Sequence, residues 1–216
     1  MPQIFHSSMM VVSRASMVVL LLVLGIIAWA ATGIYKAGYT TGVGVPVEQP
    51  IPFSHEHHVN GLGISCEYCH VSVREASFAG IPPTNTCMTC HSQIWNTSPM
   101  LAPVRASAST QRPLSWVRVH DLPDFTYFNH SIHVNKGIGC ETCHGQVDKM
   151  PLTWRVNTLF MSWCLDCHRN PEQHLRPPDE IFTMNWNPAD GKPGKELAAD
   201  YGINVKQLSD CSICHR

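Results

Sequence analysis

This sequence has no cysteine outside one recurring motif and almost no excess of charge of either sign. Its 216 residues carry 15 lysines and arginines against 16 aspartates and glutamates, which leaves a formal net charge of −1. Such a chain lacks the basic surface that neutralises phosphates, so we expect no nucleic acid partner. Long helical or alternating hydrophobic periods are also few, whereas glycine (14) and proline (16) are frequent. The sequence therefore offers little material for an ordinary hydrophobic core.

The motif Cys-x-x-Cys-His occurs five times and uses all ten cysteines of the chain. It is the attachment motif of c-type haem. Residues i, i+3 and i+4 share one face of a helical turn, so both thiols reach the haem vinyl groups while the histidine turns to the iron. The sequence therefore predicts five covalently bound haem c groups. The attachment cysteines are Cys66, Cys69, Cys87, Cys90, Cys140, Cys143, Cys164, Cys167, Cys211 and Cys214. The proximal iron ligands are then His70, His91, His144, His168 and His215.

Zinc and dithiol chemistry are the alternatives for paired cysteines. Seventeen residues separate Cys69 from Cys87 and 20 separate Cys143 from Cys164, spacings that also occur in four-cysteine zinc sites. A single pair could likewise be a thioredoxin-like dithiol. A histidine follows every pair, however, and five pairs do not divide into complete four-cysteine sites. We therefore interpret all five motifs as haem attachment sites.

One uninterrupted apolar run stands apart from the rest of the chain. It spans residues 15–34, carries no charge, and lies between Arg14 and Lys36. A helix of this length covers about 30 Å, the thickness of the hydrocarbon core of a membrane. Residues 28–30 also fit a signal peptidase site, but the run is longer than the apolar core of a signal peptide. We expect an uncleaved transmembrane anchor over residues 15–35, after a cytoplasmic segment of residues 1–14.

The motifs, rather than the charges that flank the run, indicate the side of the membrane. Bacteria attach haem to this motif outside the cytoplasm, so residues after Tyr35 should lie on the periplasmic side of the inner membrane. No cysteine lies near the N-terminus to carry a lipid. The sequence thus predicts a single-pass membrane protein whose motif-bearing part is exported.

The exported part is small for its cofactors. Residues 37–216 provide 180 residues, or 36 for each of five haems, too few for a separate hydrophobic core. We expect a mostly irregular chain with short α-helices wrapped around five covalently bound haems, so that the macrocycles themselves form the core.

Two segments of the exported part match each other. Phe53 and Phe128 are each followed by histidines at +2 and +5, by Val-Asn at +6 and +7, and by the first cysteine of a motif at +13 or +12. A second motif begins 21 residues later in one copy and 24 in the other. The chain therefore contains two dihaem modules offset by 75 residues, followed by a fifth haem site. The expected divisions are a linker at 36–52, a first module with its connector at 53–125, a second at 126–195 and a fifth-haem segment at 196–216.

Phe-x-His-x-x-His shortly before Cys-x-x-Cys-His resembles the multihaem cytochromes of the c3/c7 type. In that family the first histidine is the distal ligand of the haem that follows, and the second ligates a neighbouring haem. The resemblance implies that His55 caps the haem on His70 and that His130 caps the haem on His144.

The second histidines of the two pairs, His58 and His133, would bind either the haems of the second motifs or a haem of the other module. The fifth distal site has two candidates. We favour His120, because it stands in a proline-containing approach to the second pair, and His174 is the alternative. His57 is interpreted as a non-ligand. Methionine is the other kind of ligand considered for this site, from Met100, Met150, Met161 or Met184.

The likeness extends beyond the c3/c7 pattern. A single anchor, a duplicated dihaem module and the sequences of residues 119–133 and 163–174 resemble the pentahaem cytochrome c subunit (ActA) of alternative complex III. That resemblance implies an electron-transfer subunit of a quinol:electron-acceptor oxidoreductase in which other subunits oxidise the quinol. The implied partners are an iron–sulfur protein, polytopic membrane subunits, a monohaem cytochrome and a soluble periplasmic electron acceptor.

Three functions fit such a chain. An electron carrier needs six-coordinate irons, an oxyanion or nitrogen-oxide reductase needs an open iron, and a stand-alone NapC/NrfH-like quinol dehydrogenase needs a quinone pocket beside the first haem. Seven candidate histidines for five distal sites make an open iron unnecessary, and no Cys-x-x-Cys-Lys variant is present. Thirty residues separate Tyr35 from Cys66, and one helix offers no walls for a quinone. We expect an electron-transfer subunit without catalytic residues of its own, and the sequence leaves open whether the chain itself is an enzyme.

Overall fold

The computed structural model describes residues 6 and 8–215 and divides the chain into two compact units. The first unit comprises Met1–Val43 and the second Gly44–Arg216. All five Cys-x-x-Cys-His motifs lie in the second unit. The division therefore falls inside the expected linker, between the apolar run and the first motif.

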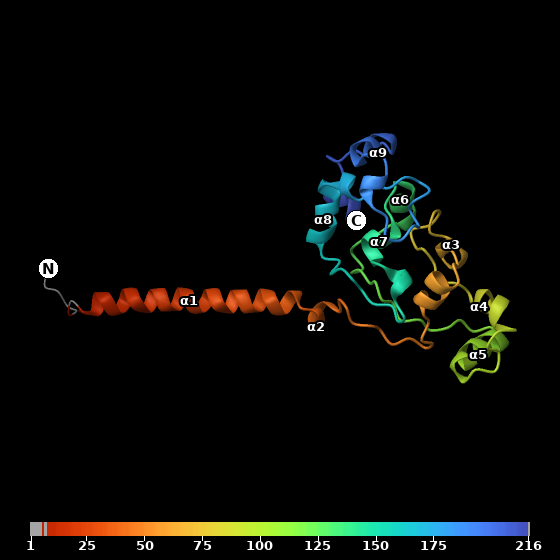
Figure 1. The fold of residues 1–216 in the computed structure, drawn as a ribbon. Coiled ribbons are helices and arrows are strands. Elements are labelled where there is room, and N and C mark those ends of the chain that lie inside the picture. Colours follow the sequence, from red (N-terminus) through yellow and green to blue (C-terminus); the bar gives the residue numbers. More distant parts are fainter. Residues whose placement is uncertain (1–5, 7, 216) are drawn as a thin grey trace. The chain divides into compact units, whose positions relative to one another are not determined.

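In the described part of the first unit, a long helix is followed by a short one (Figure 1). Helix α1 spans Ser8–Lys36, and α2 spans Gly38–Thr41 before ending at Gly42, whose φ of 71° lies in the left-handed region that glycine favours. No residue of α1 is buried within the chain, and its most apolar stretch has a mean hydropathy of 2.6. Helix α1 is thus long and apolar enough to cross a membrane. It begins at Ser8 rather than at residue 15, and so includes Arg14.

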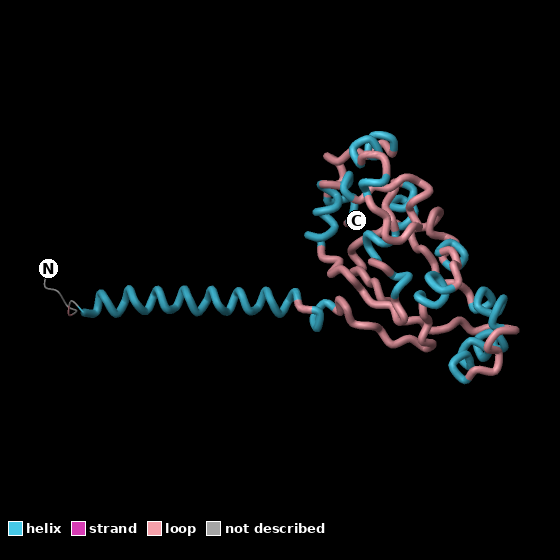
Figure 2. Tube along the Cα trace, in the orientation of Figure 1, coloured by secondary structure: helices cyan, strands magenta, loops and turns pink. Residues whose placement is uncertain are grey.

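The second unit is a set of short helices joined by long irregular loops, as the loop segments in Figure 2 show. Its helices are η1 (Glu56–Gly61), α3 (Cys66–Cys69), α4 (Thr84–His91), η2 (Pro99–Leu101), α5 (Ala102–Thr110), α6 (His130–Asn135), α7 (Cys140–His144), η3 (Val147–Lys149), α8 (Met161–Arg169), η4 (Pro171–Gln173), η5 (Pro188–Asp190), α9 (Gly194–Asp200) and α10 (Cys211–Cys214). Residues 6 and 8–215 contain no β-strand, only isolated antiparallel bridges of Pro46 with Trp154 and of Ile138 with Leu175. This helix-rich arrangement agrees with the expected fold class.

Hydrophobic packing in the second unit is confined to small clusters. One cluster comprises Ile51, Leu101 and Val104, with Leu114 and Trp116 packed against it. Another comprises Val73, Val134 and Ile181, with Phe182 beside it. A unit of this length normally encloses a larger apolar interior. The polypeptide therefore buries little apolar surface by itself, as expected of a chain with few residues for each cofactor.

The two matching segments of the sequence adopt the same arrangement, with a difference of one residue. The first forms the π-helical turn η1 and the second forms the α-helical turn α6. A hydrogen bond from the Ile64 amide to the His58 carbonyl (3.1 Å) closes the first turn, and one from the Ile138 amide to the His133 carbonyl (3.0 Å) closes the second. A glycine with positive φ precedes the isoleucine in both copies. The first loop contains one more residue, which the wider π turn accommodates.

Candidate haem-binding sites

Each Cys-x-x-Cys-His motif forms a short helix or ends one. The five helices are α3, α4, α7, α8 and α10. At the start of α3, the Ser65 hydroxyl accepts a hydrogen bond from the Glu67 amide over 3.3 Å and so caps the helix. The helical turn places the two cysteines and the histidine of a motif on one face, which is the arrangement that haem attachment needs.

A main-chain carbonyl fixes the orientation of four of the five motif histidines. The imidazole Nδ1 donates to this carbonyl in His70 with Gly80 (2.7 Å), His91 with Ile94 (3.0 Å), His168 with Leu208 (2.8 Å) and His215 with Phe125 (3.1 Å). A carbonyl oxygen only accepts hydrogen bonds, so each of these rings carries a proton on Nδ1. Nε2 is then available for a metal, and the bonded Nδ1 holds the ring in place.

Three of the four histidines in the repeated pairs have the same contact. Nδ1 donates to a carbonyl in His58 with Ser54 (2.8 Å), His130 with Ser77 (3.0 Å) and His133 with Asn129 (2.7 Å). The fourth, His55, has Nδ1 3.0 Å from the hydroxyl of Thr153. By contrast, Nδ1 of His6, which is no candidate ligand, accepts a hydrogen bond from the Ser8 amide over 3.3 Å. Seven candidate ligands in the second unit thus share an orientation that frees Nε2.

Three motif histidines have a second imidazole at a centroid separation that fits one iron between the two rings. The ring centroids are 6.2 Å apart for His58 and His91, 6.4 Å for His130 and His144, and 6.2 Å for His133 and His168. Two imidazoles that bind one metal ion from opposite sides, with metal–nitrogen bonds of about 2.0 Å, have centroids about 6.3 Å apart. The residues present therefore fit bis-histidine haem iron at three motifs. The structure also brings the second histidine of each pair to the second motif of its own module.

Each histidine pair packs against its own phenylalanine, in the same way in both copies. Phe53 lies edge-to-face with His55 at 5.0 Å and stacks on His58 at 4.4 Å. Phe128 lies edge-to-face with His130 at 4.8 Å and stacks on His133 at 4.4 Å. These ring contacts restrict how the imidazoles turn. They explain why each copy of the repeat begins with phenylalanine.

His144 lies in a crowded group of imidazoles from both modules. The ring of His120 meets it edge-to-face at 4.3 Å. Desolvation lowers the pKa of His144 to about 3, with smaller contributions from His120 and His130. Desolvation also lowers the pKa of His55 to about 4, with the neighbouring His70 as the second cause. These rings are therefore uncharged at neutral pH, which is the form that binds a metal.

The candidates for the fifth distal site differ in burial. Nε2 of His120 is buried and has no hydrogen-bond partner, although buried polar atoms normally have one. Burial lowers the pKa of His120 to about 4, with the charge of Arg155 as the second cause. His174 is partly exposed at the end of η4. The additional histidine of the first pair, His57, is exposed and stacks on Trp95 at 5.7 Å.

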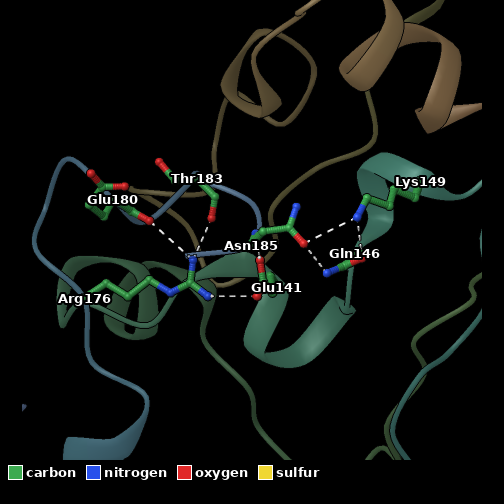
Figure 3. A network of polar contacts seen from close by, with 7 residues as sticks. All are labelled: Glu141, Gln146, Lys149, Arg176, Glu180, Thr183 and Asn185. Atoms are coloured by element: carbon green, nitrogen blue, oxygen red, sulfur yellow. Dashed lines mark hydrogen bonds and ion pairs between the residues drawn. The ribbon is translucent and has the colours of Figure 1, made fainter. Parts of the chain in front are cut away.

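A polar network that the sequence did not indicate joins the third attachment helix to a distant connector (Figure 3). The guanidinium of Arg176, which is 4% exposed, pairs with Glu141 of α7 at 3.6 Å and donates to the Thr183 carbonyl over 2.7 Å. It also lies over the ring of Trp186 at 5.1 Å. A Cβ on Gly139 would lie 2.4 Å from its guanidinium carbon, so this close approach requires glycine there.

Asn185 extends the same network (Figure 3). Its amide donates to the carboxylate of Glu141 over 2.5 Å, and its side-chain oxygen accepts from Gln146 and Lys149. Asn185 has a φ of 58°, a left-handed conformation that asparagine tolerates better than most residues. The network therefore fixes residues within and just after the third motif to the chain that follows the fourth.

Two comparisons with known proteins agree with this geometry. Residues 126–216 match the family of cytochrome c7 and related cytochromes c, in which haem c is bound covalently. The multihaem cytochrome c subunit of menaquinone reductase from Nitratidesulfovibrio vulgaris is 34% identical to this chain over 149 residues. The match covers 59% of this chain and 70% of that subunit. The chain therefore belongs to the multihaem cytochrome c family that includes this subunit, and its C-terminal part is a domain of the cytochrome c7 type.

Proposed function

We propose that the chain holds five haem c groups, one at each Cys-x-x-Cys-His motif, with a histidine on both sides of each iron. The proposed pairs of proximal and distal ligands are His70 with His55, His91 with His58, His144 with His130, and His168 with His133. Support comes from the three ring separations of 6.2 to 6.4 Å and from the carbonyls that leave Nε2 free. The remaining pair is His70 with His55. It is supported by the charge of His70, which contributes to the lowered pKa of His55 and so indicates that the two rings are close.

For the fifth site, on His215, we propose His120 as the distal ligand, with His174 as the alternative. Nε2 of His120 is buried and has no hydrogen-bond partner, which favours this residue as the iron ligand. At 4.3 Å, His120 and His144 are too close to flank one iron, which leaves His120 for another site. The segment that carries His120 also approaches the fifth motif, because the Phe125 carbonyl accepts from His215 over 3.1 Å.

The function that this arrangement supports best is electron transfer. Haem c, when bound, supplies one-electron redox chemistry at its iron. With a histidine on each side of every iron, the chain would leave no open position at the metal for an oxyanion or nitrogen oxide. The opposed imidazole pairs at 6.2 to 6.4 Å are the observation that carries the proposal. They favour an electron carrier over a reductase.

Helix α1 serves as the membrane anchor in this proposal, with the second unit on the periplasmic side. Its length of 29 residues and its mean hydropathy of 2.6 support a membrane span. Attachment of haem outside the cytoplasm supports the orientation. The division of the chain at Val43 supports an anchor that is structurally separate from the exported part.

The partners in this proposal are the other subunits of a membrane quinone oxidoreductase. On the resemblance to alternative complex III, an iron–sulfur protein and polytopic subunits oxidise the quinol, and this chain delivers electrons to a soluble periplasmic acceptor. The relative from N. vulgaris favours a second candidate, because its name describes reduction of menaquinone. In that case the chain receives electrons from a periplasmic donor and passes them towards the quinone-reactive subunits.

Purification of the native complex in mild detergent tests the cofactors and partners. We expect five haems per chain in a pyridine haemochrome assay, low-spin ferric signals in electron paramagnetic resonance, and copurifying iron–sulfur and polytopic membrane proteins. Fewer haems, or a substantial high-spin signal, would contradict the proposal. Recovery of a solitary active chain would contradict the proposed partners.

The direction of electron flow is tested on the same preparation. Rapid haem reduction on addition of a menaquinol analogue supports delivery to a periplasmic acceptor. Rapid reduction by a reduced soluble cytochrome, followed by reoxidation with a menaquinone analogue, supports the second candidate.

A further inference from the structure

Asp148 is a buried acidic residue that the ligand scheme does not use. It lies in η3, four residues after His144, and is 6% exposed. Its Oδ1 has no hydrogen-bond partner. A carboxylate oxygen buried without a partner is costly, because water would otherwise solvate its charge. The fold retains this cost, which indicates a nearby group that the carboxylate stabilises.

The surroundings of Asp148 belong to the first haem site. Together with Cys66, the first attachment cysteine, Asp148 lines an open pocket of about 390 Å³. The same pocket is lined by Val59, which follows His58 in η1. Helices η1 and η3 are held together, because the Glu56 amide donates to the carbonyl of Met150 over 3.1 Å. Asp148 is thus fixed beside the first motif and beside a turn that carries candidate distal ligands.

The acidic residues around the first motif differ in how they are neutralised. Glu67, inside the motif, pairs with Arg74 at 2.6 Å. Asp148 has no such cation in the part of the chain that the structure describes. Burial raises the pKa of the Cys66 thiol, and the charges of Glu67 and Asp148 add to that rise. Asp148 and Cys66 also line the same pocket, so the carboxylate is close to the attachment atoms of the first site.

At the third site, by contrast, the buried charge is paired, because Arg176 and Glu141 form an ion pair at 3.6 Å. The cationic side chain of Arg176 packs against Gly139, immediately before Cys140. Burial raises the pKa of Cys140 to about 12, the nearby Cys66 adds to the rise, and Arg176 opposes it. The first and third attachment sites are therefore neighbours with an unpaired carboxylate at one and an ion-paired guanidinium at the other.

A ferric haem carries one more positive charge than a ferrous haem. A nearby carboxylate in a medium of low dielectric constant stabilises the ferric form and lowers the reduction potential. We propose that Asp148 sets the reduction potential of the haem attached through Cys66 and Cys69 below that of the haem attached through Cys140 and Cys143. This inference rests on the five-haem assignment proposed above.

The test is Asp148→Asn in the full-length, haem-loaded chain, with a redox titration followed by electron paramagnetic resonance. The amide keeps the shape and removes the charge, so we expect one haem to shift to higher potential while the other four stay in place. His55→Ala identifies the first haem, because loss of its distal ligand converts that signal to high spin. Glu48→Gln is the control, since it removes one negative charge from an exposed position and should leave all potentials unchanged.

Different results would overturn the role of Asp148 and the proposed function. Five haems with unshifted potentials in Asp148→Asn would overturn the role of Asp148 alone, whereas fewer than five haems in the unaltered chain would overturn the haem assignment. A redox-difference infrared spectrum of the unaltered chain covers the case in which the variant loses haem. We expect a carboxylate band that changes at the potential of the first haem, and its absence would also overturn the inference.

Discussion

At the scale of single residues, a candidate ligand is distinguished from other histidines by what holds its two ring nitrogens. His130 has Nδ1 on the Ser77 carbonyl and faces His144 at a centroid separation of 6.4 Å. His57 is exposed and stacks on Trp95 instead. The difference lies in the contacts of the rings, since both residues are histidines that precede a motif.

His130→Ala should therefore leave the third iron five-coordinate. We expect a new high-spin ferric signal that amounts to about one haem in five, because only one distal ligand is lost. His57→Ala is the matched control and should retain the low-spin spectrum. A low-spin His130→Ala, or a high-spin His57→Ala, would contradict the proposed ligand pairs.

His120→Ala and His174→Ala decide the fifth distal ligand. We expect the high-spin signal in the His120 variant, because its buried Nε2 has no other partner. The His174 variant should match the unaltered protein. The reverse result would assign the fifth site to His174, and a low-spin spectrum in both would favour methionine.

At the scale of elements, helix α7 is held by the ion pair of buried Arg176 with partly exposed Glu141. Arg176→Met should lower the free energy of unfolding by about 3–5 kcal/mol, because it leaves the carboxylate without its cation. Thermal melting of the haem-loaded protein, followed by circular dichroism, measures the loss. Arg169→Met removes an exposed arginine and should change the stability by less than about 0.5 kcal/mol. Equal stability of the two variants would show that the network of Figure 3 contributes little.

At this scale, some features could be predicted from the sequence and others could not. The motif helices and the repeated pairs were predictable, because their chemistry requires fixed spacings such as those at Cys66 and Cys140. The π turn η1 was not, although the additional residue before Cys66 was its signal. The acceptors at Gly80 and Leu208 could not be predicted either, because any residue supplies a main-chain carbonyl. The contact of Arg176 with Glu141 joins segments 35 residues apart, and no spacing rule links them.

At the scale of the whole molecule, the small hydrophobic clusters indicate a fold that depends on its cofactors. The second unit, expressed where haem is not attached, should show little helical circular dichroism and rapid proteolysis. The haem-loaded protein is the control. A protease-resistant, helical chain without haem would contradict the prediction that the macrocycles form the core.

The two compact units should also be separable. Replacement of residues 1–36 by a cleavable export signal should yield a soluble protein with the same number of haems as the full-length chain. The reason is that no residue of α1 is buried within the chain. A pyridine haemochrome assay and the visible spectrum provide the comparison, and loss of haem would show that α1 is needed for folding.

The carbonyl acceptors of the motif imidazoles have a consequence for how this protein can vary over evolution. Replacing the side chain of Ile94 or Leu208 leaves the oxygen atom that orients the neighbouring ring. The loops can therefore accumulate substitutions freely as long as the path of the backbone is kept. Insertions and deletions, which move that path, are the changes that the metal centres should tolerate least.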